Sequence, residues 1–328
     1  MSNKLACFML VFCLVVSCSE NDDNPASANI TVPLLSTDSV SIVTAVSARC
    51  CGTVISDGGS PLTARGVCWC KNKKPTVDND SMIEGSNTGC YSCLITGLTA
   101  NTTYYVKAYA TNSIGTGYGE ELSFTTKVLE TGTVVDINGN TYKTVKIGNQ
   151  WWMAENLKVT HYRNGDLIPI ITNDSEWQNL STGACCSYDN TMMNTVNYGN
   201  LYNWYAVNDT RSIAPAGWHI PGNEEWQILV GFLGGSSVAG GMMKESGTVH
   251  WKDPNSDATN AVIFTALPGG FRYSYGKFYN IGFSGSWWSA SEYNVNYSFE
   301  WNITNTSSEI ARYNQDKRSG YSVRCIKD

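Results

Sequence analysis

Apolar and polar residues alternate in short runs through the first third of the chain, the pattern of strands that bury one face. The predicted strands cover residues 40–55, 65–70, 91–95, 105–109 and 119–126. Turn-forming sequences such as Asp57-Gly58-Gly59 separate them. Short strands at this spacing predict an all-β sandwich over residues 30–126.

Residues 131–328 combine strand and helix periods. Asn138-Gly139 stands between two apolar runs and predicts a β-hairpin. Residues 222–235 carry apolar residues at i, i+3, i+4 and i+7, which predicts a helix, and residues 201–207 predict a shorter aromatic helix. The apolar face of the longer helix consists of Trp226, Leu229, Val230 and Leu233. The other predicted strands are 271–283, 287–291, 297–303, 310–313 and 321–326, so an α+β domain is expected.

Residues 1–17 have the pattern of a secretion signal, in which Lys4 precedes an unbroken apolar run that is too short to span a bilayer. Residues 14–18 resemble a bacterial lipobox, which implies cleavage before Cys18 and acylation (palmitate-type) of that cysteine. The alternative is an ordinary signal followed by a chance cysteine. Residues 18–29 then form a flexible acidic tether, in which residues 19–23 resemble the export signal of Bacteroidetes surface lipoproteins; the alternative is a solvated acidic linker. We therefore expect a membrane partner through a lipid anchor on Cys18, in the outer membrane, facing the cell exterior.

Composition and charge exclude several classes of function. The chain of 328 residues has a net charge of −6, and only 15% of its residues are charged, so the basic face of a nucleic-acid-binding protein is not expected. Three histidines provide little material for a metal site or a catalytic triad. The sequence contains no zinc-protease, phosphate-loop, dinucleotide or nucleophile-elbow motif. We expect a protein that is not an enzyme and that uses no cofactor and no metal.

Five segments of the first domain form a recognisable set. They are Ser56-Asp57-Gly58-Gly59 and residues 63–69, 97–106, 108–112 and 123–126. Together they resemble the fibronectin type III-like modules of Bacteroidetes surface proteins. The resemblance implies a spacer or presenting domain without a catalytic role.

Seven segments of the second domain form another set. They are residues 136–140, 143–157, 198–207, 215–226, 266–272, 287–292 and 320–325, which include Pro215-Ala216-Gly217-Trp218-His219 and the closing Val323-Arg324-Cys325. In this order they resemble the Fibrobacter succinogenes major paralogous domain over almost the whole of residues 131–328. That family is similar to C-type lectins in fold, so the resemblance implies a C-type-lectin-like domain.

Nine cysteines remain after the signal and the acylated Cys18, which is an odd number. Disulfides are the default in an exported chain, whereas zinc would need reduced thiols, and the spacings match no common zinc module. By alternation, Cys50 and Cys93 point inward on adjacent strands and could pair. The candidate disulfide cysteines are Cys50, Cys68, Cys93, Cys186 and Cys325.

The family resemblance bears on Cys325. Family members carry a cysteine just before the Pro-Ala-Gly-Trp-His segment, where this sequence has Ala214. If that cysteine bonds the closing one, Cys325 has lost its partner here, and Cys185 or Cys186 could substitute.

The second domain holds ten of the 11 tryptophans, most of them in segments that carry the family resemblance. In C-type-lectin-like folds the late loops and strands form the binding face, which implies ligand contacts outside those segments. The candidates are Tyr275, Tyr279, Tyr293, Asn294, Asn296 and Trp301. A calcium-dependent sugar site is not expected, because Trp301-Asn302-Ile303 lacks the acid of the usual strand motif and no Glu-Pro-Asn loop occurs.

The expected function is non-catalytic ligand binding at the cell surface, as an adhesin or lectin-like module for a glycan or a protein. The alternative is a structural or accessory subunit of a surface assembly. A third, less favoured, is an enzyme of the formylglycine-generating fold. Ser39 and Ser81 each follow an aspartate and resemble Bacteroidetes O-glycosylation sites.

Overall fold

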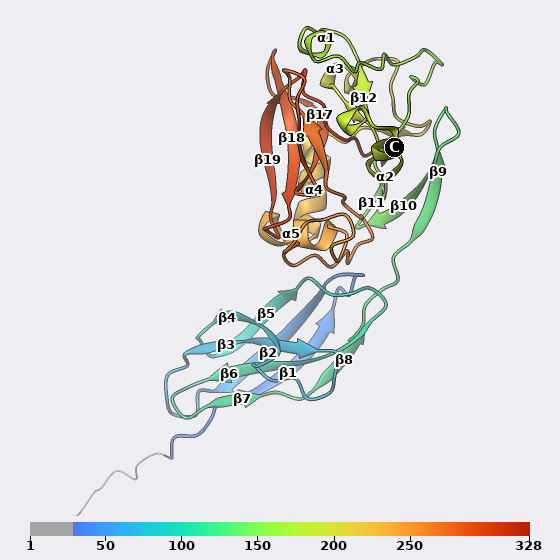
Figure 1. The fold of residues 1–328 in the computed structure, drawn as a ribbon. Coiled ribbons are helices and arrows are strands. Elements are labelled where there is room, and N and C mark those ends of the chain that lie inside the picture. The colour runs from blue at the N-terminus through green and yellow to red at the C-terminus, as the bar shows by residue number, and fades with distance from the viewer. Residues whose placement is uncertain (1–28) are drawn as a thin grey trace, which may run out of the picture.

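The computed structural model describes residues 29–328, which form two consecutive domains (Figure 1). The predicted signal segment, Cys18 and the tether up to residue 28 lie outside the described residues. Most elements are antiparallel strands, and the helices are short and confined to the second domain. None of the helices within residues 29–328 is long and apolar enough to cross a bilayer.

Two antiparallel sheets face each other in the first domain, one ordered β1-β2-β5 and the other β4-β3-β6-β7, with β8 also paired to β6. The strands are β1 (Leu34–Ser41), β2 (Ala48–Ser56), β3 (Ala64–Cys70), β4 (Asp80–Gly85), β5 (Gly89–Ile95), β6 (Thr103–Thr111), β7 (Thr116–Tyr118) and β8 (Leu122–Thr125). Alternate residues such as Val67, Ile95 and Val106 point inward and form the core between the sheets. The all-β architecture predicted for this part of the chain is therefore confirmed.

The single strand predicted over residues 40–55 is wrong, because these residues belong to β1 and β2, which pair with each other. Between the two strands Ile42 takes a φ of 48°, and the Thr44 hydroxyl accepts a hydrogen bond from the Ser47 amide at 2.9 Å. These polar contacts turn the chain. Val46, in this turn, packs into the core of the second domain, so the two domains touch there.

The second domain is built on a five-stranded sheet, β14-β20-β11-β10-β9, and a three-stranded antiparallel sheet, β17-β18-β19, with two short ribbons, β12-β13 and β15-β16. The strands are β9 (Thr131–Val135), β10 (Thr141–Ile147), β11 (Gln150–Met153), β12 (Cys185–Cys186), β13 (Leu201–Tyr202), β14 (Trp218–His219), β15 (Gly269–Arg272), β16 (Phe278–Ile281), β17 (Ser284–Glu292), β18 (Tyr297–Thr304), β19 (Ile310–Asp316) and β20 (Ile326–Lys327). The helices are α1 (Asp174–Gln178), α2 (Met192–Tyr198), α3 (Trp204–Val207), α4 (Asn223–Phe232) and α5 (Ser236–Met243), with a 3-10 turn at Tyr188–Asn190.

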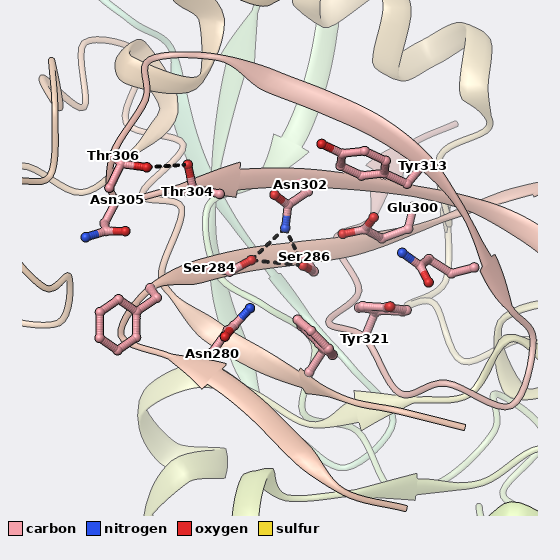
Figure 2. A pocket seen from close by; sticks show the side chains of 13 residues that line it. Asn280, Ser284, Ser286, Glu300, Asn302, Thr304, Asn305, Thr306, Tyr313 and Tyr321 are labelled. Carbon is pink, nitrogen blue, oxygen red and sulfur yellow. Dashed lines mark hydrogen bonds between the residues drawn. The ribbon is translucent and has the colours of Figure 1, made fainter. Parts of the chain in front are cut away.

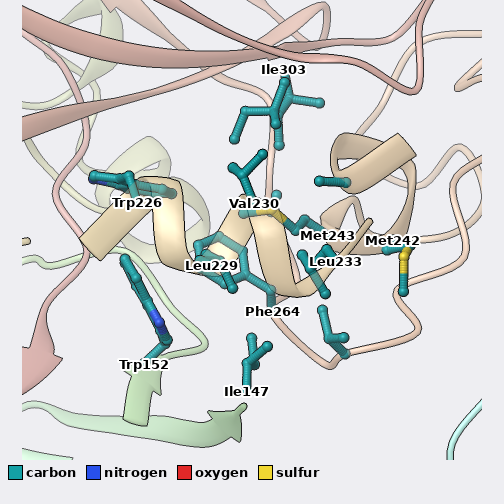
Figure 3. Packing of buried hydrophobic residues seen from close by; sticks show 14 of the residues in the cluster. Ile147, Trp152, Trp226, Leu229, Val230, Leu233, Met242, Met243, Phe264 and Ile303 are labelled. Atoms are coloured by element: carbon teal, nitrogen blue, oxygen red, sulfur yellow. The ribbon is translucent and has the colours of Figure 1, made fainter. Parts of the chain in front are cut away.

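Helix α4 lies between the two larger sheets and organises the main core (Figure 3). Its predicted apolar face is confirmed, since Trp226, Leu229, Val230 and the following Leu233 are all buried. The Trp226 ring packs 4.8 Å from Trp152 on one side and stacks 5.9 Å from Trp301 on the other, measured between ring centroids. This packing fixes which face of β18 is buried.

Three other predicted elements differ from the structure. Only Trp204–Val207 of the predicted helix 201–207 is helical, because the Asn203 side chain caps it by accepting from the Ala206 amide. The strand predicted over 271–283 is the hairpin β15-β16, turned through Gly276 at a φ of 96°. The strand predicted over 321–326 pairs regularly only at Ile326–Lys327. Helix α5 was not predicted, because its glycines hide the helical period.

Candidate functional site

A groove of about 400 Å³ lies on the face of the β17-β18-β19 sheet that points away from α4 (Figure 2). Strand alternation creates this face, since Trp301 and Ile303 of β18 enter the core, so Glu300 and Asn302 point the other way. Tyr313 is directly opposite Glu300 on β19 and shares its face. We call this site the Glu300 groove; its polar floor comes from Ser284, Ser286, Glu300 and Asn302, and its aromatic walls from Phe271, Tyr313 and Tyr321.

Glu300 is the unusual group in the groove. Its side chain is only 2% exposed, and its Oε2 atom has no hydrogen-bond partner among the described residues. Burial raises the pKa of Glu300 to about 8, and hydrogen bonding with Ser286 and Asn302 offsets part of that effect. At neutral pH the carboxyl is therefore mostly protonated, so it can donate one hydrogen bond and also accept others.

Asn302 and the two serines form the rest of the polar floor. The Asn302 Nδ2 atom donates to Ser284 Oγ at 2.6 Å and to Ser286 Oγ at 2.8 Å. Both serine oxygens are thus used as acceptors, and the Asn302 Oδ1 atom is left to accept from a ligand. The floor therefore presents closely spaced uncharged donors and acceptors.

The two tyrosines in the aromatic walls differ in how far their rings are exposed to solvent. Tyr321 is buried, and its ring packs edge-on against Trp288 at 4.7 Å, which makes it a fixed wall. Tyr313 is 52% exposed and stands at the rim of the groove. A ligand with an apolar face can lie against both rings.

Two sequence-predicted ligand residues, Tyr275 and Tyr279, lie on the β15-β16 hairpin beside the groove. Their hydroxyls are 3.2 Å apart, and both side chains are exposed. The Tyr279 ring stacks at 6.3 Å on Phe271, which itself lines the groove. These two tyrosines therefore border the Glu300 groove without lining it.

Three further candidates, Tyr293, Asn294 and Asn296, are exposed in the turn between β17 and β18. The Asn294 Oδ1 atom accepts from the backbone amides of Asn296 and Tyr297, both at 3.0 Å, so it holds the turn. The Tyr293 ring packs edge-on against Phe299 at 5.4 Å. None of the three lines the groove.

The assignment of Trp301 to the binding face is wrong. Its side chain is 5% exposed and lies in the core against Trp226. The same alternation that turns Trp301 into the core places Glu300 and Asn302 on the groove side of β18. Sequence reasoning missed both of them, together with Ser284, Ser286 and Tyr313. The usable signal was the order Glu300-Trp301-Asn302, in which a large apolar residue between two polar ones marks the inward face.

All nine cysteines within residues 29–328 are free thiols in the structure. Cys50 stands directly opposite Cys93 in the β2-β5 register, and both are buried. Burial raises the pKa of Cys50 to about 12 and that of Cys93 to about 11, so reduced thiols there stay protonated. Cys68, Cys186 and Cys325 are buried as well. Their pairing stays a prediction.

The two predicted O-glycosylation sites lie on strands of the first domain. Ser39 on β1 and Ser81 on β4 are both exposed, as a glycosylated serine must be. Within residues 29–328 no three His, Cys, Asp or Glu side chains gather as a metal site.

The second domain has the sequence pattern of a known family. A family model described as the Fibrobacter succinogenes major domain matches residues 145–327, more than half of the chain. No protein of curated function matches the chain.

Similar solved structures include the sensor domain of the anti-sigma factor RsgI4 from Pseudobacteroides cellulosolvens, in two forms, and domains A168–A170 of titin. The shorter RsgI4 form is 22% identical, covers 30% of this chain and 99% of its own, and has a TM-score of 0.23. The other form is 23% identical, covers 30% of this chain and 76% of its own, and also scores 0.23. Titin is 24% identical, with coverages of 29% and 32% and a TM-score of 0.22. These scores are too low to transfer a fold or a function.

Proposed function

The chain belongs to the Fibrobacter succinogenes major domain family, and we propose that this member binds neutral glycans through the Glu300 groove. In this proposal the protein is an outer-membrane lipoprotein, acylated at Cys18 and facing the cell exterior. The first domain acts as a fibronectin type III-like spacer, and the second is a C-type-lectin-like tip. It binds its ligand and does not transform it.

The buried carboxyl of Glu300 carries this proposal. A polar atom that is buried without a partner costs free energy, so a native structure that retains one usually uses it. Glu300 Oε2 is such an atom, and Glu300 lines the open groove, so a small displacement of its side chain brings the carboxyl within reach of a ligand. A sugar hydroxyl can both accept from the protonated carboxyl and donate to its second oxygen.

The chemistry of the walls favours an uncharged polyol over an ion. None of the 13 described residues that line the groove is Lys, Arg or His, so an anionic ligand would find no counter-charge. Glu300 is the sole acid among these 13. The rings of Tyr313, Tyr321 and Phe271 offer surfaces against which a sugar ring can pack.

A glycan array probed with the purified full-length protein tests this proposal. We expect binding to neutral glycans that falls about tenfold in Tyr313→Ala, because that ring loses its stacking contact. Tyr293→Ala is the matched control, since Tyr293 is also 52% exposed but lies outside the groove.

The outcomes separate the alternatives. Binding that falls in Tyr293→Ala and not in Tyr313→Ala would move the site to the β17-β18 turn. An array without signal, from protein with a native circular dichroism spectrum, would refute glycan binding and favour a protein ligand or a structural role in a surface assembly.

A further inference from the structure

The exposed aromatic side chains of the protein gather around the Glu300 groove. Six aromatic side chains are exposed in the described part of the chain, and four of them lie at the groove or on the adjoining β15-β16 hairpin. Phe283 and Tyr313 line the groove, and Tyr275 and Tyr279 belong to the hairpin. Exposed rings that gather in one region mark a surface that a ligand can contact.

The two hairpin tyrosines are held in place by a third ring. Tyr275 stacks on Tyr273 with an angle of 17° between the rings and 5.3 Å between their centroids. Tyr279 packs against the same Tyr273 ring at 5.2 Å, and the Tyr275 hydroxyl donates to the Tyr279 hydroxyl at 3.2 Å. We call Tyr275 and Tyr279 the tyrosine platform. Rings that are already held in this way lose little conformational freedom when a ligand binds.

The turn that carries the tyrosine platform is braced by Arg272, which is fully buried. Its guanidinium donates from Nε to the Gly276 carbonyl at 2.8 Å and from a terminal nitrogen to the Ile171 carbonyl at 2.7 Å. Gly276 has a φ of 96°, and a Cβ atom there would lie only 2.7 Å from Asp174. The platform is therefore built on a fixed turn.

The tyrosine platform continues the Glu300 groove. Tyr279 stands opposite Phe271 in the β15-β16 register, so the two side chains share a face of the hairpin, and Phe271 lines the groove. The residue after Tyr279 is Asn280, which points into the groove (Figure 2). A ligand that extends out of the groove past Asn280 therefore meets the Tyr279 ring next.

Tyr279 also lines an open pocket of about 400 Å³, which we call the Asp189 pocket. Asp174 in this pocket already accepts from Lys277 at 2.5 Å and from the buried Arg272 at 3.0 Å, so neither cation is left for an anionic ligand. The Asp189 carboxylate is exposed and forms no salt bridge within residues 29–328, and it can accept hydrogen bonds from hydroxyl groups. The pocket thus suits the same uncharged polyols as the groove.

We propose that the Glu300 groove, the tyrosine platform and the Asp189 pocket form one continuous site, whose ligand is a neutral oligosaccharide and not a single sugar. One sugar unit lies in the groove, the following units pack on Tyr279 and Tyr275, and the chain reaches the Asp189 pocket. This inference rests on the proposed function and deepens it by stating the length of the glycan.

Calorimetric titration of the full-length protein with cello-, manno-, xylo- and N-acetylchito-oligosaccharides, each from the monosaccharide to the hexasaccharide, tests the proposal. We expect affinity to rise about tenfold between the shortest and the longest members that bind, because the added units gain contacts with the platform. The double variant Tyr275→Ala/Tyr279→Ala should remove this gain and leave the affinity for the shortest member unchanged. Asp189→Gly, which suits the φ of 51° at that position, should weaken binding of the longest members only. Tyr293→Ala is the matched control, because this exposed ring lies outside all three parts of the site.

Equal affinity for short and long members would overturn the inference and leave the proposed function standing. The same holds for a gain with length that survives in the double variant, since the added units would then lie elsewhere, and for an equal loss in Tyr293→Ala. If none of the four series binds, the inference is overturned, whereas the proposed function is refuted only by a glycan array without signal. Tyr275 and Tyr279 are exposed, so the variants should fold, which their circular dichroism checks.

Discussion

The substitution Glu300→Gln removes a buried ionisable group and keeps the shape of the side chain. It therefore isolates the free-energy cost of ionising the Glu300 carboxyl in the folded protein. The pKa of Glu300 rises from its ordinary 4.5 to about 8 in the folded protein. Between these two values the unfolded chain has lost this proton and the native protein still holds it. Stability therefore falls as pH rises through this window, and the loss is complete above about pH 8.

The size of the effect follows from the shift. One pKa unit corresponds to about 1.4 kcal/mol, so the full shift would amount to about 5 kcal/mol. The groove is open at one side, and water and mobile dipoles there screen the ionised carboxylate. We compare the free energy of unfolding of Glu300→Gln with that of the wild type at each pH. This difference should be about 2–4 kcal/mol more in favour of the variant at pH 9 than at pH 4.5.

Urea unfolding of the full-length protein, followed by tryptophan fluorescence, measures this difference. Ten of the 11 tryptophans lie in the second domain, so the signal reports the domain that holds Glu300. Glu309→Gln is the control, since Glu309 is exposed next to β19 and should change the pH dependence little. If the free energies of unfolding of the wild type and Glu300→Gln run parallel from pH 4.5 to 9, the reasoning about a buried neutral acid is refuted.

Three further results are expected. Lys244→Met should lose about 3 kcal/mol in urea unfolding, because the buried ammonium donates to the Ser256, Thr304 and Ser307 carbonyls; unchanged stability would contradict this role. Trp301→Ala should lose about 3–5 kcal/mol by leaving a core cavity, measured in the same way, and a loss below 1 kcal/mol would show that the ring is not packed as described. Mass spectrometry of peptides from alkylated native protein should reveal a Cys50–Cys93 disulfide, since the two cysteines face each other on β2 and β5. If both thiols are found alkylated instead, the predicted disulfide is wrong.

Helix α4 and the all-β character of the first domain could be predicted, because their hydrophobic periods are strong and agree with burial. The apolar face of α4 spans two turns and needs no partner to be recognised. Elements that depend on long-range contacts could not be predicted. The segment before Ile326 looks like a strand in sequence, but the Arg324 side chain instead binds backbone carbonyls at Met153 and Phe264.

The candidate site was harder to predict, for a physical reason. An acidic residue in a strand is expected to face water, and no local pattern indicates that Glu300 is buried in the folded domain. Exposed aromatics such as Tyr275 attract attention in the sequence because of their chemistry alone. They lie next to the groove because the β15-β16 hairpin folds back through Phe271, a contact that only the tertiary structure provides.

A crystal structure of the protein with the neutral saccharide that binds most tightly on the array tests the central claim most directly. We predict that a sugar hydroxyl lies within hydrogen-bond distance of the Glu300 carboxyl and of Asn302 Oδ1, with the sugar ring against Tyr313. A sugar found at the β17-β18 turn around Tyr293, with the Glu300 groove free of ligand, would contradict the account.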